Sequence, residues 1–133
     1  MSIKIVNPTS LYDGTHFGMS HVTIDTDNGL VFVSGQVDWD TNYQVKHDNI
    51  EAQAESAMQN LVTALEAASS SMANILHLRI YIRGEIGEHG EKVVPIIAQY
   101  IGQHRPATTA IGVASLASPD TLIEIEAIAK VTK

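Results

Sequence analysis

LIEIEAIAKV, residues 122–131 near the end of the chain, alternates between two kinds of side chain. One set is small or aliphatic: Ile123, Ile125, Ala127 and Ala129. The other set is mixed in character: Leu122, Glu124, Glu126 and Ile128. Because successive side chains of a strand point to opposite faces, this alternation predicts a β-strand with one face packed under helices.

A second stretch, residues 75–82, repeats the two-sided pattern. Its aliphatic set is Leu76, Leu78, Ile80 and Ile82, and its mixed set is Ile75, His77, Arg79 and Tyr81. Aliphatic, aromatic and charged residues together on a broad sheet face predict a subunit interface with polar groups embedded in it. The alternative is a half-exposed amphipathic sheet with ordinary cross-strand ion pairs.

Two helices are predicted from apolar residues that recur at steps of three and four. The first covers residues 48–69, and its apolar stripe consists of Ile50, Ala54, Met58, Leu61 and Leu65. Asp48 and Glu51 resemble a capping box, which predicts a helix start at Asp48. The second helix covers about 91–102, with Pro95 tolerated only within its first turn.

Four further strands complete the predicted element order β-β-β-α-β-α-β-β. They cover residues 3–6, 21–25, 30–34 and 108–116. The Asp27-Asn28-Gly29 turn predicts a hairpin between the second and third strands. The turn at 117–120 joins the last two strands and predicts a second hairpin.

These elements predict an α+β (α/β) fold with a single mixed sheet. The unit from residue 30 to 82 is expected to be a right-handed parallel crossover. Two helices cover only one face of such a sheet, so the second face needs another partner. A chain of 133 residues is expected to form one domain over 1–133.

Composition excludes several classes of function. The formal net charge of -7 argues against nucleic-acid binding, which normally requires a basic patch. The chain has no cysteine, and its six histidines show no metal-site spacing, so no metal and no cofactor are expected. No apolar run reaches the roughly 18 residues of a membrane span, and no secretory signal is evident. A soluble, cytoplasmic protein is the expectation.

Three segments resemble the reactive-intermediate deaminase family, also called Rid, YjgF or endoribonuclease L-PSP-like. They are VFVSGQ at 31–36, MSHV at 19–22, and the C-terminal region that runs from Pro106 through IEIEAIA at 123–129. The resemblance covers nearly the whole chain. It implies a chorismate-mutase-like, YjgF-like fold and a homotrimer with the helices outside. It also implies three small-molecule clefts between subunits, where deaminating members hydrolyse enamines and imines to ketoacids and ammonia.

The resemblance also indicates site residues. In deaminating members an Arg directly follows the Pro-Ala pair and grips the substrate carboxylate, but here Thr108 follows that pair. Arg105 lies on the other side of the pair and is a candidate for the cleft rim, the alternative being a solvated loop cation. Met19 stands where many members have Tyr, and Val94 where deaminating members tend to carry Asn.

Three family positions remain unchanged in this chain. The resemblance implies that the backbone of Gly35 lines the cleft, that the amide of Ala110 lies near the ligand, and that Glu124 is the cleft carboxylate. Ordinary structural alternatives exist: Glu124 pairs with Arg79 or with a base of a neighbouring chain, Thr108 is simply a good strand former, and Gly35 merely ends a strand.

The replacement of Arg by Thr predicts a changed ligand preference. A neutral hydroxyl replaces the charged, bidentate guanidinium group of Arg. The cleft is therefore expected to prefer a neutral, polar or cationic ligand over a small carboxylate. One hypothesis is an enzyme that hydrolyses an imine, an enamine or a related labile metabolite, with Glu124 holding the water. A second is a binding or sensing module without turnover, and the weakest is an endoribonuclease or translation inhibitor.

Overall fold

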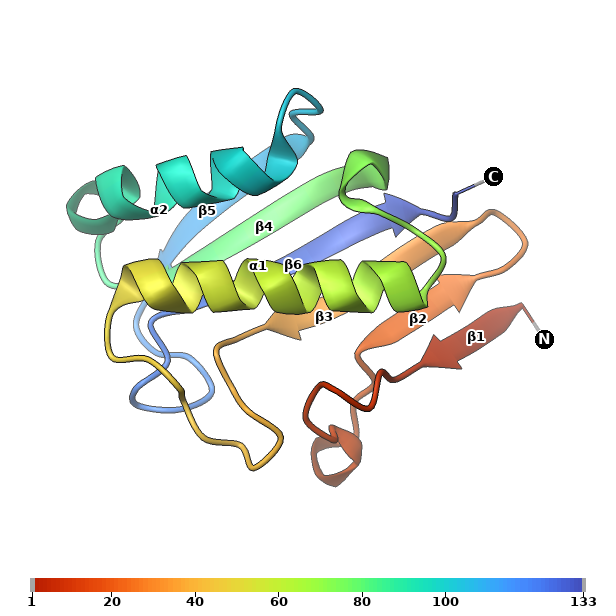
Figure 1. Cartoon of the computed structure of the whole chain (residues 1–133), viewed down its shortest axis with the longest axis horizontal. Helices are drawn as coiled ribbons and strands as arrows, with labels where there is room; N and C mark the ends of the chain where they lie inside the picture. Colours follow the sequence, from red (N-terminus) through yellow and green to blue (C-terminus); the bar gives the residue numbers. More distant parts are fainter. Residues whose placement is uncertain (1, 133) are drawn as a thin grey trace.

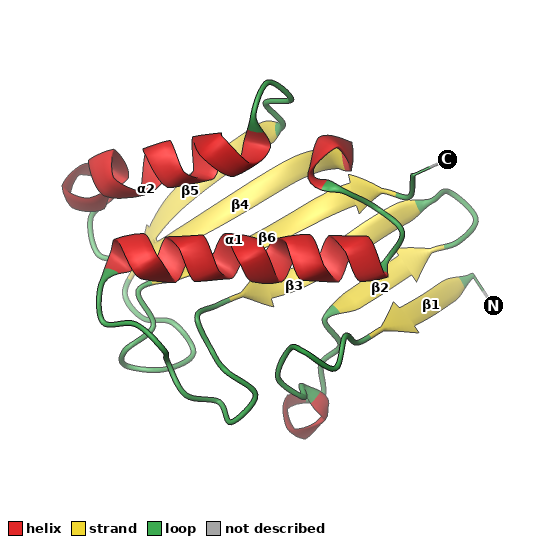
Figure 2. Cartoon of the chain, viewed as in Figure 1, coloured by secondary structure: helices red, strands yellow, loops and turns green. Residues whose placement is uncertain are grey.

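The computed structural model describes residues 2–132. One sheet carries two long helices on the same side (Figure 1), and Figure 2 shows that the other side of the sheet bears none. The strands are β1 (Ile3–Val6), β2 (Val22–Asp25), β3 (Leu30–Gln36), β4 (Ile75–Arg83), β5 (Ala107–Val113) and β6 (Ile123–Lys130). The helices are α1 (Ile50–Ala67) and α2 (Ile86–Ile101), with short 3-10 turns η1 (Thr15–Phe17) and η2 (Met72–Asn74). The predicted element order and the α+β class are confirmed.

The sheet order is β1-β2-β3-β6-β4-β5. β3 and β4 each pair antiparallel with β6, so they run parallel to each other, as the crossover through α1 predicts. The predicted hairpin between β5 and β6 is wrong, because β5 instead pairs in parallel with β4 at the edge of the sheet. β6, whose inner face is wholly aliphatic, thereby gains a neighbour on both sides and lies in the middle of the sheet.

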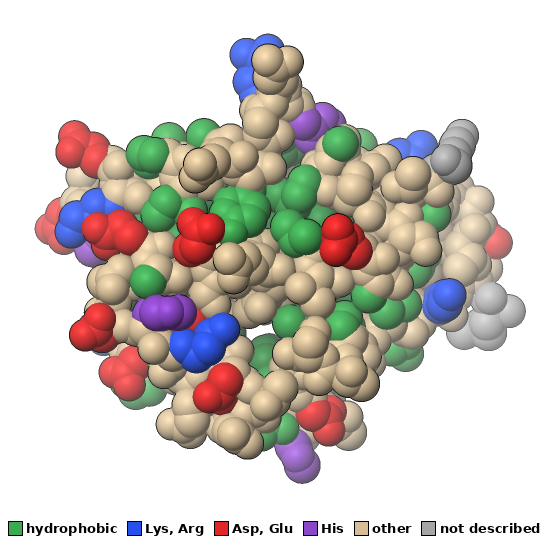
Figure 3. Space-filling view, viewed as in Figure 1, with side chains coloured by type: hydrophobic (Ala, Val, Ile, Leu, Met, Phe, Trp, Pro, Cys, Tyr) green, Lys and Arg blue, Asp and Glu red, His purple; other side chains and the backbone are tan. Residues whose placement is uncertain are grey.

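The core lies between the sheet and α1. Its fully buried members include Met58, Leu61, Leu65, Leu78, Ile123 and Ile125. The alternation of β6 is confirmed, with Ile123, Ile125, Ala127 and Ala129 buried and the residues between them only partly exposed. On the outer side of the helices, charged side chains of both signs are scattered among apolar ones (Figure 3). Within residues 2–132, no helix combines the length and apolarity needed to cross a membrane.

Both predicted helix starts are wrong. The side chain of Asn49, not Asp48, caps α1 by accepting a hydrogen bond from the backbone N–H of Ala52 at 2.8 Å. α2 begins at Ile86, five residues before the predicted start, so Pro95 lies inside the helix rather than in its first turn. The glycines at 87 and 90 have low helix propensity and gave that stretch the appearance of a turn.

The predicted faces of β4 fail at its first residues. Ile75 is buried although it was expected on the mixed face, and Leu76 is 46% exposed although it was expected in the core. The cause is a bulge, because Ile75 pairs with Ala129 while His77 pairs with Ile128. One extra residue in β4 reverses the faces on one side of the bulge. From His77 onward the predicted alternation holds.

A buried amide joins three segments beside the start of β6. Gln53, on α1, has no exposed surface. Its Nε2 donates to the carbonyl oxygens of His47 and Asp120, both at 2.9 Å, and its Oε1 accepts from the Leu122 N–H at 2.8 Å. Gln53 therefore fixes the loop before α1 and the loop before β6 to the same helix.

Replacing Gln53 with Ala is expected to lower the free energy of unfolding by about 3 kcal/mol, since three buried backbone groups lose their partner. Urea unfolding followed by circular dichroism measures the loss at fixed protein concentration. Gln59→Ala, at an exposed position on the same helix, is the matched control and should change stability by less than about 0.5 kcal/mol. Equal effects of the two substitutions would contradict the assignment.

Candidate functional site

A cavity of about 390 Å³ lies at the open face of the sheet. It is bordered by the loop between β1 and β2 and by the segments that follow β3 and β5. Its lining residues are Tyr12, Phe17, Met19, Ser34, Gly35, Trp39, Ala117 and Glu124, and we call it the Glu124 cavity. It brings together three of the predicted site residues, Met19, Gly35 and Glu124. Its volume is within the range of small-molecule sites, roughly 300–1,000 Å³.

Gly35 and Glu124 are in direct contact in this cavity. A Cβ atom added at Gly35 would lie 2.7 Å from Cγ of Glu124 and closer still to its carboxylate. Gly35 lies inside β3, where the pairing with β6 shifts register between Val33 and Gln36. The missing side chain therefore gives the Glu124 carboxylate the room it occupies, and Gly35 does more than end a strand.

The Glu124 carboxyl carries a charge that its surroundings do not favour. Burial raises its pKa above the ordinary value of 4.5, and the negative charge of Glu126 raises that pKa further. Glu126 accepts a hydrogen bond from the Tyr81 hydroxyl, and its Oε2 lies 3.9 Å from Nη1 of Arg79. Arg79 therefore pairs with Glu126 and not with Glu124, contrary to the ordinary structural alternative for Glu124.

Three aromatic side chains form one wall of the cavity, and we call Tyr12, Phe17 and Trp39 the aromatic wall. The sequence indicated none of them as site residues. Trp39 also packs locally, since its ring lies 5.0 Å from that of Tyr12 and its Nε1 donates to Thr121 Oγ1 at 3.3 Å. These residues lie on loops without periodicity, so no pattern in the sequence marked them.

A buried histidine holds Tyr12 in place. His21 is 1% exposed, and its Nε2 lies 2.7 Å from the Tyr12 carbonyl oxygen. The amide of Gln36 donates to Nδ1 of His21 at 3.1 Å and to the Ser34 carbonyl at 3.0 Å. Because Nδ1 accepts, the ring carries its proton on Nε2, where it donates to Tyr12. His21 is thus a positioning residue outside the cavity.

The other predicted site residues lie elsewhere. Thr108 pairs with Leu78, whose side chain is in the core, whereas Glu124 pairs with Tyr81 on the open face. The side chains of Thr108 and Glu124 therefore point to opposite faces of one sheet. Thr108 and Arg105 line a separate groove of about 350 Å³ between α2 and β5.

The groove beside Thr108 is largely apolar and also contains Val94, which is 62% exposed. The Thr108 hydroxyl donates to the Pro106 carbonyl oxygen at 2.9 Å. Arg105 adopts a left-handed φ of 50° just before Pro106. Ala110 follows on β5, two residues after Thr108 and on the same side of the strand. Within one chain the predicted site residues therefore lie on two separate surfaces, the Glu124 cavity and the region around the groove between α2 and β5.

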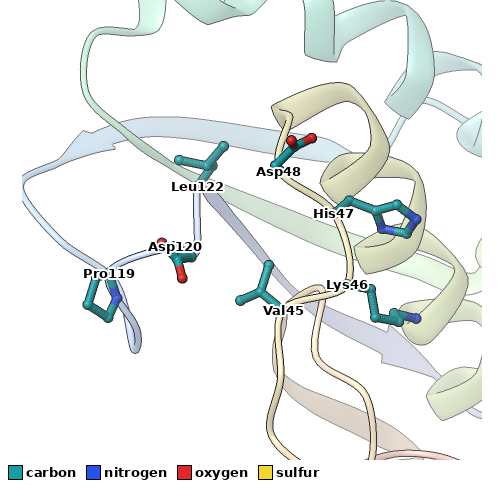
Figure 4. A pocket seen from close by; sticks show the side chains of 7 residues that line it. All are labelled: Val45, Lys46, His47, Asp48, Pro119, Asp120 and Leu122. Atoms are coloured by element: carbon teal, nitrogen blue, oxygen red, sulfur yellow. The ribbon is translucent and has the colours of Figure 1, made fainter.

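A wider hollow of about 630 Å³ lies between the loop at 45–48 and the loop at 119–122. In Figure 4 the Lys46 and His47 side chains extend away from Asp120. His47 is engaged by Asp38, which is 1% exposed and accepts from the His47 backbone N–H at 2.7 Å and from its ring at 3.1 Å. This hollow contains none of the predicted site residues, so the Glu124 cavity is the stronger candidate.

Comparison with known proteins identifies the family of this chain. The chain matches the family model described as Endoribonuclease L-PSP over residues 18–131. A RutC family protein of Pyrococcus horikoshii is 35% identical over 102 residues, which are 75% of this chain and 78% of that protein. Protein HMF1 of Saccharomyces cerevisiae is 31% identical over 102 residues, which are 77% of each chain.

A solved structure from Mycobacterium tuberculosis, described as a member of the YjgF/YER057c/UK114 family, has the same fold. It is 30% identical with a TM-score of 0.82, over 98% of this chain and 100% of that chain. Fold and cavity thus define a small α+β protein with one open sheet face. The chain belongs to the Endoribonuclease L-PSP family, as the resemblance predicted. Tyr12 and Phe17 of the aromatic wall lie before the matched range.

Gly35→Ala is expected to lower the free energy of unfolding by about 1–3 kcal/mol, because the new methyl group overlaps the Glu124 side chain. The same substitution in a Glu124→Ala background should lose most of this effect, since the colliding atoms are gone. Gly87→Ala is the control: it lies in α2 with nothing near its Cβ and should not destabilise. Additive effects at 35 and 124 would contradict the contact.

The raised pKa of Glu124 also predicts that the stability of the chain depends on pH. Because its pKa is raised, the folded chain binds this proton more tightly than the unfolded chain, whose Glu124 titrates near 4.5. The free energy of unfolding should therefore fall as pH rises from about 4.5 through the raised pKa. Glu124→Gln should be more stable than wild type above this interval and should show a smaller slope.

Urea unfolding at a series of pH values from about 4 to 8 measures this slope. Glu91→Gln, an exposed position on α2, provides the control and should keep the wild-type slope. Parallel curves for wild type and Glu124→Gln would show that the carboxyl titrates alike in the folded and unfolded chains.

Proposed function

We propose that the chain works as a homotrimer whose intersubunit clefts bind a small molecule and hydrolyse an imine, an enamine or a related labile metabolite. One observation carries the proposal. Thr108 and Glu124 point to opposite faces of one sheet, so a site that contains both must combine Thr108 of one copy with Glu124 of another. The groove between α2 and β5 and the Glu124 cavity are then the two halves of one cleft.

The exposed edge and open face of the sheet support assembly. β5 is a seven-residue edge strand without charge or proline, and almost all of it is exposed. Monomeric proteins usually protect such an edge with charges, proline or a bulge. The open face carries Ile5 and Phe32 on β1 and β3, away from the β5 edge, and both are exposed on one cross-strand row through Thr23. Both features favour burial against further copies of the chain.

The chemistry proposed for the cleft needs one carboxylate and one water. Water attacks the carbon of the C=N bond, and Glu124 accepts a proton from that water. The protonated carboxyl returns that proton to the nitrogen, which gives a carbinolamine. Glu124 then transfers the remaining hydroxyl proton to the nitrogen as the C–N bond breaks, so ammonia leaves and a carbonyl compound remains. A carboxyl with a raised pKa suits both steps, because it exchanges a proton more readily near neutral pH than an ordinary Glu does.

A binding or sensing module without turnover is the second candidate. It is favoured by the groove beside Thr108, where the hydroxyl is engaged by Pro106 and exposed Val94 adds only apolar surface. Endoribonuclease activity, which the family's description names, is supported least, because the formal net charge is -7.

A deamination assay with freshly generated imines tests the proposal. The wild-type chain should accelerate hydrolysis of an imine without a carboxylate more than that of 2-iminobutyrate, and Glu124→Gln should remove the acceleration. Thr108→Arg should raise activity on 2-iminobutyrate at least about tenfold, because a charged fork then grips the carboxylate.

Gln59→Arg is the matched control, since it adds the same charge at an exposed position on α1, outside both the groove beside Thr108 and the Glu124 cavity. It should leave activity on 2-iminobutyrate unchanged. Equal gains from both substitutions would show a general charge effect. A wild-type chain that sediments as a stable monomer, or that hydrolyses no imine, would overturn the proposal.

A further inference from the structure

We propose that the Glu124 cavity selects an organic cation, such as a protonated imine or amine that carries an apolar or aromatic group. This deepens the proposed function, on which it rests for the role of the cavity, by naming the charge and shape of the substrate. Of the described residues that line the cavity, Glu124 is the only one with a charged side chain, and it shares the cavity with the aromatic wall.

The rings of the aromatic wall are inclined to one another and are not stacked. Tyr12 and Phe17 meet at 77° with ring centroids 6.4 Å apart, and Phe17 and Trp39 meet at 53° and 6.2 Å. Tyr12 is buried among other rings, so the π-faces open to a guest are those of Phe17 and, in part, of Trp39, and cations bind to such faces. Phe17 is 58% exposed, so its ring covers little protein and remains open to a ligand.

The side-chain donors around the cavity are already engaged. The Ser34 hydroxyl donates to the Ser20 carbonyl oxygen at 2.5 Å, Trp39 Nε1 donates to Thr121, and the Tyr12 hydroxyl contacts the sulfur of Met19 at 3.6 Å. A carboxylate ligand would therefore find no charged donor among these described lining residues and would face the Glu124 carboxylate. An ammonium or iminium group would find an acceptor and aromatic faces.

Electrostatics point the same way. The charged neighbour that affects Glu124 is Glu126, whose partner is Arg79. A cation entering the cavity supplies the countercharge that Glu124 lacks, and partial burial strengthens that attraction relative to water.

Isothermal titration of the full chain with three probes of similar shape tests the inference. Benzylammonium should bind at least about tenfold more tightly than benzyl alcohol, and benzoate should bind no better than the alcohol. Glu124→Gln should abolish the preference for the cation, whereas the control Glu91→Gln should preserve it. Phe17→Leu, at an exposed position, should weaken benzylammonium binding about threefold to thirtyfold with little change in folding.

The outcomes separate this inference from the proposed function. Preferential binding of benzylammonium without imine hydrolysis would support the inference and overturn the enzymatic proposal. Hydrolysis combined with equal affinity for the three probes would overturn the inference alone, as would tight binding of benzoate. A cation preference that survives Glu124→Gln would also overturn it, because the countercharge would then lie elsewhere.

Discussion

The position of β6 between β3 and β4 is the constraint on which the rest of the structure depends. Its aliphatic face is sealed under α1, and this burial fixes the register of both neighbouring strands. Once that register is set, Glu124 must emerge on the open face, opposite Tyr81 and against Gly35. A central strand of the sheet thus carries the one carboxylate that lines the Glu124 cavity among the described residues.

The alternation in β6 was sufficient to predict a sheet with helices on one side, because a two-residue period identifies the face that is buried. It could not predict the neighbours of β6, because pairing depends on the whole topology. The bulge at Leu76 and the early start of α2 were missed for local reasons, namely one inserted residue and two glycines. Neither an inserted residue nor a helix that contains glycines can be recognised from a simple periodic pattern.

The candidate site, like the fold, could be predicted from the sequence only in part. The family resemblance identified Met19, Gly35 and Glu124, and the structure brings them together in one cavity. It also indicated Thr108, Ala110 and Arg105, but only strand register reveals that Thr108 and Glu124 face opposite ways. The aromatic wall escaped notice because Tyr12 and Phe17 lie on a loop, where spacing carries no information. Sequence motifs therefore marked the residues, while topology decided which of them meet.

The contact between Gly35 and Glu124 has a consequence for how this family can diversify. A larger residue at 35 is tolerated only after the residue at 124 has become smaller, so the order of the two substitutions matters. A lineage that keeps the carboxylate must also keep the glycine, and one that loses the carboxylate becomes free to fill the vacated volume. The two positions should therefore evolve as a pair, with the acidic group changing first.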